Sequence, residues 1–493
     1  MERLTFNIGS SRGGPLVVAG RRPPTGGGGD RGARVSQAVA AIRERYDWDY
    51  VWMLTFTALL FFRPQDQIPG LDLLHLSELT AIAGLAAMAV RRMSAGKSIA
   101  HVNAEVIGVV VLGGIIVLTL PFSIWPGGSA KVFTDIYVKI ILIFALMMST
   151  ITSPRRVRQM TWVMIVASGY IGARAVFDYV RGVNLVEGDR VRGAVGGMFE
   201  NPNDLALNLV TFLAPTLFII LFDRKPSRRL FACGLAVAML AAIVCTKSRS
   251  GFLGLIAMGA VVMYYTAKVK PAAVAAVVVA GLMALPVMPE TFWARMDSIM
   301  NAEEDQTGSR AARLRLIEQG VQVFIENPIT GIGAGQFKNY NAPDVVEKWR
   351  VTHNVWLQVA AELGIAGVLT FGFLVMRGFS SNFAAMRVLR RTRKRAGPPT
   401  RLNARAEDLD LQLTENERRT LDLNAKGMFA AMVGWAVCSL FASVAFNWTF
   451  YYVLALGVAG REILISRRAA AKAAEEAAPI ATVPPNRLIR VHA

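Results

Sequence analysis

Residues 352–376 read THNVWLQVAAELGIAGVLTFGFLVM and join a polar segment to a long apolar one. An apolar run of about 20 residues is long enough to cross a bilayer as a helix. His353 therefore lies at the polar edge of a predicted membrane helix, and histidine is the side chain best suited to proton transfer near neutral pH. Taken alone, this position is more typical of an interfacial residue that caps the helix than of a catalytic base.

The composition of the whole chain agrees with this interpretation of residues 352–376. Of the 493 residues, 53% are hydrophobic, and the mean hydropathy of +0.40 is too high for an ordinary soluble protein. Apolar runs of similar length recur, so we expect an all-α polytopic membrane protein with about twelve membrane-spanning helices. The expected helices cover residues 48–62, 71–90, 104–122, 131–149, 158–177, 204–222, 229–245, 251–267, 271–288, 354–376, 428–446 and 448–466.

In a membrane protein, the distribution of Lys and Arg across the loops indicates the topology, and we interpret the net charge of +19 in this way. No nucleic acid is expected as a partner. Short loops on the side of the N-terminus hold twelve Lys and Arg residues, against seven on the other side. Both termini are therefore predicted to be cytoplasmic. We expect a transmembrane domain at 46–466, with an outer segment at 289–352, a cytoplasmic connector at 377–426, and disordered basic tails at 1–45 and 467–493.

The outer segment shows internal order. A helix is predicted from Ser309 to Glu326, and it ends before Asn327-Pro328 and a glycine-rich turn at residues 331–335. A long ordered segment outside the membrane usually carries function.

Two further motifs precede predicted helices on the same side. In the first, Arg190 and Arg192 stand before FENPND at 199–204, where Asn201 is expected to cap a helix and Pro202 to begin it. The second, TKSRSG at 246–251, is a short turn that holds two cations, one of them Arg249. Lys and Arg are usually enriched in cytoplasmic loops, so arginines in outer loops are unexpected. Their presence strengthens the case for a functional role of both motifs.

The motif around His353 continues as a polar stripe. Asn354, Gln358 and Glu362 follow one another at helical spacing, while His353 and Glu362 would lie on opposite sides of the helix. Glu362 is therefore not expected to orient His353. We interpret it as a buried carboxylate that bonds to a neighbouring helix.

Topology brings the three motifs to one surface. The helices predicted to begin near residues 204, 251 and 354 all run inward, so their positive N-terminal ends face outward together. Helix N-termini beside arginines form an anion site, and the planar guanidinium matches phosphate oxygens. The implied ligand is a phosphate or diphosphate at the outer leaflet, with a lipid-linked diphosphate as the natural candidate.

At this point the sequence resembles a known family, the O-antigen ligase and O-antigen polymerase superfamily of bacterial inner-membrane glycosyltransferases, which includes protein O-oligosaccharyltransferases. The resemblance covers about residues 155–375. It rests on Arg192-Gly193 with FENPN at 199–203, on SRSG at 248–251, on NPITGIG at 327–333, and on His353-Asn354 followed by ELG at 362–364.

The resemblance implies a GT-C-like fold and transfer of a glycan from undecaprenyl diphosphate to an acceptor hydroxyl on the periplasmic side. The acceptor would be lipid A-core, or another glycan or a protein. His353 would be the general base, and Arg249 with Arg192 or Arg190 would hold the diphosphate. The reaction would invert the anomeric carbon and need no metal or other cofactor. An O-antigen polymerase or protein O-oligosaccharyltransferase stays open, and a multi-helix transporter is a more distant alternative.

Several other side chains are secondary candidates for contact with substrate. Asp135 is expected to pair with Lys139, and Arg174 with Asp178, because each pair is four residues apart on a helix. The secondary candidates for ligand contact are Arg310, Arg313, Asn201, Asn203, Asn354 and Lys139.

Overall fold

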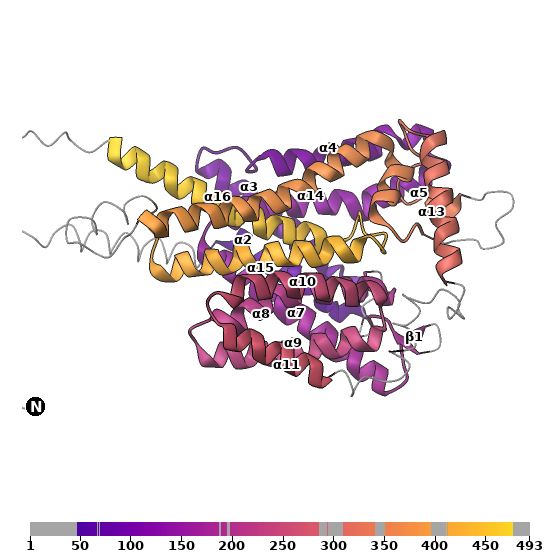
Figure 1. The fold of residues 1–493 in the computed structure, drawn as a ribbon. Helices are drawn as coiled ribbons and strands as arrows, with labels where there is room; N and C mark the ends of the chain where they lie inside the picture. The colour runs from indigo at the N-terminus through magenta and orange to yellow at the C-terminus, as the bar shows by residue number, and fades with distance from the viewer. Residues whose placement is uncertain are drawn as a thin grey trace, which may run out of the picture. The chain divides into compact units, whose positions relative to one another are not determined.

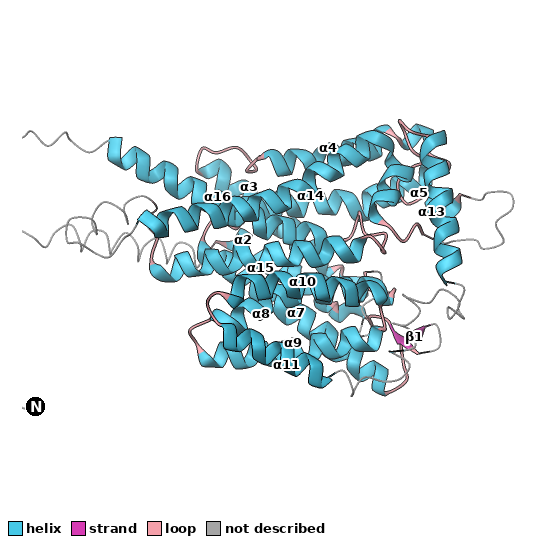
Figure 2. Cartoon of the chain, in the orientation of Figure 1, coloured by secondary structure: helices cyan, strands magenta, loops and turns pink. Residues whose placement is uncertain are grey.

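The structure is a computed structural model, and the residues it describes are all-α apart from one short hairpin (Figures 1 and 2). The residues it describes are 47–66, 68, 70–186, 189–194, 198–284, 293, 309–340, 351–395, 411 and 413–476. The expected tail at 1–45 lies outside this set, as does most of the outer segment before residue 309.

Each predicted span falls on a helix. In chain order the helices are α2 (Trp48–Phe62), α3 (Leu76–Ser94), α4 (Ala104–Leu118), α5 (Pro126–Lys131), the π-helix η4 (Val132–Tyr137), α6 (Val138–Thr150), α7 (Pro154–Val180), α8 (Pro202–Phe222), α9 (Pro226–Thr246), α10 (Arg249–Ala267), α11 (Pro271–Ala284), α13 (Ser309–Glu326), α14 (Val355–Arg395), α15 (Glu415–Ser439) and α16 (Trp448–Glu476). Short 3-10 turns are η1 (Pro64–Asp66), η2 (Asp72–Leu74), η3 (Leu120–Phe122) and η7 (Phe337–Asn339), and β1 (Leu185–Val186) pairs antiparallel with β2 (Arg190–Val191).

Among the described residues, seven helices are long and apolar enough to cross a membrane. The protein is therefore an all-α polytopic membrane protein, as predicted. The count of twelve spans stays a prediction, because α2, α3, α4, α11 and α15 are shorter or less apolar than these seven. The seven cover Pro126–Thr150, Pro154–Val180, Pro202–Phe222, Pro226–Thr246, Arg249–Ala267, Val355–Arg391 and Trp448–Ala473.

Helices extend into two segments that were predicted to lie outside the membrane-spanning helices. The connector expected at 377–426 is largely helical, since α14 continues to Arg395 and α15 begins at Glu415. The tail expected from residue 467 is helical as far as Glu476, at the end of α16. Both extensions are rich in Ala, Arg and Lys, which have high helix propensity, so these helices continue beyond their apolar segments.

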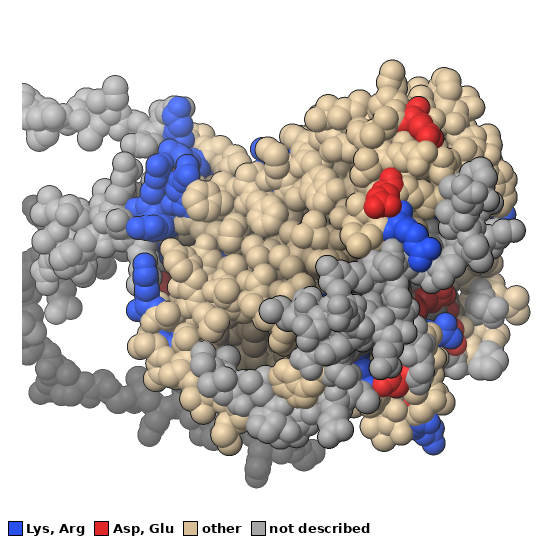
Figure 3. All heavy atoms as spheres, turned by 45° about the vertical axis from the view of Figure 1, so that its right-hand side comes forward, with Lys and Arg blue, Asp and Glu red and all other residues tan. Residues whose placement is uncertain are grey.

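The long helices run side by side, and α13 lies across one end of them and packs against α14 (Figure 1). We call this the α13 end. The space-filling view shows a broad band almost free of charged side chains, between basic side chains on the left and charged ones of both signs on the right (Figure 3). Such a band is what a bilayer requires of a spanning protein.

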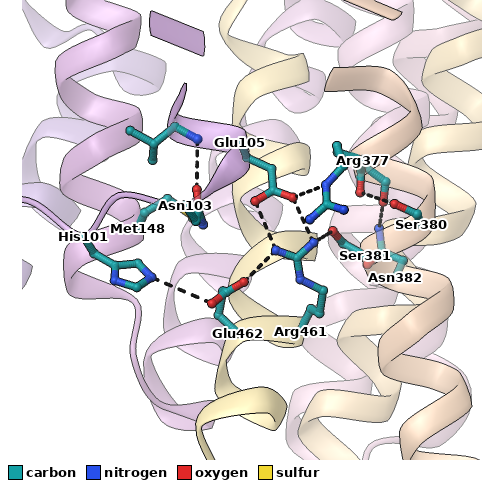
Figure 4. Close-up of polar contacts among 12 residues, drawn as sticks. His101, Asn103, Glu105, Met148, Arg377, Ser380, Ser381, Asn382, Arg461 and Glu462 are labelled. Carbon is teal, nitrogen blue, oxygen red and sulfur yellow. Dashed lines mark hydrogen bonds and ion pairs between the residues drawn. The ribbon is translucent and has the colours of Figure 1, made fainter. Parts of the chain in front are cut away.

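An ion cluster joins three helices (Figure 4). The fully buried Glu105 of α4 accepts hydrogen bonds from Arg461 of α16 at 2.8 and 3.1 Å, and from Arg377 of α14 at 2.5 Å. Arg461 also donates to Ser381 and to Glu462. A buried carboxylate between two guanidinium groups fixes the relative positions of α4, α14 and α16.

Candidate functional site

Three helices begin with capped N-termini at the positions where the sequence placed its motifs. Asn201 caps α8 and accepts from the Asn203 N–H at 2.8 Å, as predicted. Ser248 caps α10 and accepts from the Gly251 N–H at 3.1 Å. Asn354 accepts from two backbone N–H groups in the first turn of α14. Asn201 and Asn354, expected as secondary ligand contacts, thus serve as helix caps.

Asn203 joins the first two motifs. Its Oδ1 atom accepts from the Arg190 guanidinium and from the Ser248 hydroxyl, both at 2.8 Å. Arg190 also donates to the Thr246 carbonyl at 3.0 Å, and it is only 3% exposed. β2, the start of α8 and the α9–α10 turn are therefore held together by one buried arginine.

The remaining cations of the two motifs have different surroundings. Arg192, two residues beyond Arg190, is exposed. Lys247 is buried, forms an ion pair with Asp189 and lies 6.0 Å from the ring centre of Tyr179. Arg249 is the first residue of α10 and is half-buried. Arg192 and Arg249 are therefore the more accessible cations at this surface.

His353 precedes α14 and does not belong to it, because the helix begins at Val355. Its backbone is left-handed, with φ of 48°, so its angular offset from Glu362 cannot be counted along a helix as the sequence suggested. The neighbouring Thr352 hydroxyl bonds to Ser443 at 2.8 Å and to the Asn354 carbonyl at 3.0 Å. His353 is thus held in a sparsely populated backbone conformation between an anchored hydroxyl and a helix cap. Such conformations cluster at functional sites.

Glu362 bonds to the glycine-rich turn and not to a neighbouring helix, which corrects its predicted partner. Its carboxylate accepts from the Gly335 N–H at 2.8 Å and from the Phe337 N–H at 3.4 Å. The carbonyl of Glu362 accepts from the Gly333 N–H at 3.0 Å. Glu362 is therefore a structural residue that fixes the turn onto α14.

Glycine is required on both sides of this contact. Gly364 interrupts α14 with φ of 65° and ψ of −162°, and a Cβ atom there would lie 2.5 Å from the Ile329 carbonyl oxygen. A Cβ on Gly331 would overlap the backbone of Glu362. The NPITGIG and ELG motifs are thus the two halves of one packed unit. The sequence contained both motifs but gave no sign that they touch.

A cavity of about 900 Å³ lies beside this unit. Met198, Asp204, Gln358 and Ser443 line it, so it connects the start of α8 with the start of α14. Parts of α2, α3, η4 and α6 complete its walls. Asp204 is the last residue of the FENPND motif, and the sequence gave no signal that it faces a cavity.

One of the two predicted ion pairs is present, and the other is not. Arg174 and Asp178 pair at 3.0 Å, as predicted. Lys139 pairs with Glu78 of α3 at 2.9 Å, and the expected partner Asp135 bonds to Thr134 at 3.0 Å. The π-helix at 132–137 changes the residue spacing, so positions four apart no longer face each other there.

The outer helix was predicted with its observed bounds, since α13 runs from Ser309 to Glu326. Arg310 and Arg313 lie on it, but their side chains lie outside the described part of the structure. Their predicted contact with ligand therefore stays a prediction.

Comparison with protein families finds a match for residues 234–372 to the model described as O-antigen ligase. The matched segment begins within α9 and contains α10, α13, the glycine-rich turn and the start of α14. It confirms the resemblance to the O-antigen ligase superfamily and indicates a membrane enzyme of the glycosyltransferase kind. A comparison with curated proteins found no match.

Proposed function

We propose that this protein is a ligase of the bacterial inner membrane. It transfers an undecaprenyl-diphosphate-linked glycan to an acceptor hydroxyl of lipid A-core, with its α13 end in the periplasm and both termini in the cytoplasm. The observation that carries the proposal is the O-antigen ligase match, which spans both Arg249 and His353. The capped starts of α8, α10 and α14 support it, because they supply positive helix ends for a diphosphate.

The mechanism we assign is a single displacement. His353 takes the proton of the acceptor hydroxyl as that oxygen forms a bond to the anomeric carbon. The bond from the anomeric carbon to the diphosphate oxygen breaks, and the configuration at the carbon is inverted. Fixed positive charge stabilises the departing diphosphate, so no metal is needed in this mechanism.

Arg249 and Arg192 are the cations we assign to the diphosphate. Arg190 was an equal candidate from the sequence, but its guanidinium bonds to Asn203 and Thr246 and is buried. Its role in this proposal is to hold β2, which precedes Arg192, against the α9–α10 turn, which precedes Arg249.

The function is tested by the glycan profile of a deletion strain, with gels of lipid-linked and finished surface glycan. Loss of a ligase should leave long lipid-linked chains and no finished glycan, and the wild-type gene should restore the finished product. Single-repeat products on finished glycan would identify a polymerase instead. An unchanged glycan profile would contradict glycan transfer altogether.

A further inference from the structure

α13 has apolar side chains on two of its sides. On one side, Leu316 and Val323 are buried where the helix packs against α14. A second side is exposed in the described part of the structure, and its four apolar side chains are 43–69% exposed. We call these four residues the α13 stripe: Leu314, Ile317, Val321 and Ile325.

The polar residues of α13 fill the remaining side of the helix. Positions three or four residues apart share one side of a helix, which groups the stripe and separates it from the polar residues. The exposed polar residues are Arg315, Glu318, Gln322 and Glu326. A helix that meets only water on its outer sides carries polar residues there, so a contiguous exposed stripe of this kind indicates an apolar partner.

α14 shows where the lipid-facing surface begins and ends. Its exposed apolar residues on one side run from Ile365 through Leu369 and Phe373 to Phe383. This segment rises about 27 Å at 1.5 Å per residue, close to the thickness of about 30 Å of a hydrocarbon core. Arg387 follows one turn later, with its guanidinium 4.9 Å from the ring centre of Phe383. Ile365 and Phe383 therefore mark the two edges of the surface that faces lipid.

α13 meets α14 at the edge marked by Ile365, which is also the first residue after the break at Gly364. The Ile365 N–H donates to the carbonyl of Pro328, two residues beyond the end of α13, at 2.8 Å. Ile329 is 75% exposed beside this bond, so the stripe continues into the lipid-facing surface of α14. Because α13 crosses the long helices at this edge, it lies along the bilayer surface and does not pass through it (Figure 1).

We infer that α13 is an interfacial helix whose stripe lies among lipid acyl chains at the bilayer surface, with its polar side toward water. The partner is a lipid surface, and the helix recognises it by apolar insertion. The polar side carries both signs of charge, with Arg315 against Glu318 and Glu326, so an anionic headgroup is not required. This inference rests only on the membrane-spanning fold and goes beyond the proposed function.

The lipid contact also has a consequence for the neighbouring turn. The glycine-rich turn at 331–335 follows α13 directly, and its Gly335 N–H donates to the Glu362 carboxylate. Insertion of the stripe therefore fixes this turn, and the first turns of α14 to which it bonds, at the bilayer surface.

Photocrosslinking to lipid tests the position of the stripe. The photoreactive amino acid p-benzoylphenylalanine, which inserts into nearby C–H bonds, replaces Ile325, Gln322 or Leu369 in the full chain, and each variant is reconstituted in phosphatidylcholine nanodiscs. The intact mass should show a lipid adduct at Ile325, as at the lipid-facing control Leu369, and none at Gln322 on the polar side. The inference is overturned by equal adducts at Ile325 and Gln322, by absence of lipid adduct at Ile325, or by a crosslink from Ile325 to a second copy.

A matched pair of variants tests whether the stripe itself holds α13 in the bilayer. With the photoreactive residue at Val321, Ile325→Asp should lower the lipid adduct about tenfold, because it removes apolar area and adds a charge. Gln322→Asp adds the same charge on the polar side and should leave the adduct unchanged. Unfolding temperatures in detergent should match, because both positions are exposed. An unchanged adduct in Ile325→Asp, or an equal fall in both variants, would contradict insertion of the stripe.

Discussion

Asn203 shows at the scale of one residue what the sequence could not resolve. Its position after Asn201-Pro202 is explained by a helix start, and its Oδ1 atom holds Arg190 and Ser248 together. The sequence predicted two arginines near one surface, but their assignment needed geometry, because the residues that meet at Asn203 lie 13 and 45 positions away along the chain. The same reason explains why Lys139 pairs with Glu78 of another helix.

The two arginines should differ in what they support. Arg190→Ala should destabilise the protein by about 2 kcal/mol, because it removes hydrogen bonds from a buried charged group. Arg192→Ala should leave the unfolding temperature unchanged and lower glycan transfer by about 100-fold, because it removes fixed positive charge from the leaving group. Thermal unfolding in detergent and transfer rates check both; the reversed pattern would assign the diphosphate to Arg190.

At the scale of elements, the sequence predicted α13 with its observed bounds and the starts of α8 and α10 to within two residues. Periodicity and capping residues are local signals, which is why these succeeded. The contact between the glycine-rich turn and the break in α14 was not predicted, since nothing local marks Gly364 as non-helical. Its left-handed backbone and its close approach to Ile329 explain the glycine.

Gly364→Ala should therefore destabilise the protein by at least about 1–3 kcal/mol, because alanine does not tolerate this backbone conformation. The control is Gly259→Ala in α10, where an added methyl group meets no atom within 4 Å. The control should be stabilised by about 0.5–1 kcal/mol, because alanine favours a helix over glycine. Unfolding temperatures measure both, and equal stability of the two variants would show that the turn does not depend on this break.

At the scale of the whole molecule, hydropathy predicted a polytopic helical protein, and each expected span falls on a helix. The lengths of α14 and α16 were underestimated, because hydropathy ends where the apolar residues end and a helix does not. The cluster of Glu105 with Arg377 and Arg461 was not predicted either (Figure 4). Its members are spread over more than 350 residues of sequence.

Glu105→Gln should cost about 3–5 kcal/mol, because it leaves two arginines without their shared carboxylate in a buried setting. The matched control is Glu415→Gln, which breaks an exposed pair with Arg224 and should cost about 1 kcal/mol or less. Thermal unfolding of both variants in detergent gives the comparison. A small and equal effect would mean that the buried cluster does not hold α4, α14 and α16 together.

The most direct measurement is the initial rate of glycan transfer by purified protein reconstituted with lipid-linked donor and acceptor. His353→Ala should lower this rate by at least about 100-fold, with donor binding and unfolding temperature unchanged, because only proton removal is lost. The control is His101→Ala, which changes a histidine beside Glu462, a member of the ion cluster around Glu105. This variant should transfer at the wild-type rate. Wild-type transfer by His353→Ala would contradict the assignment of His353 as the base.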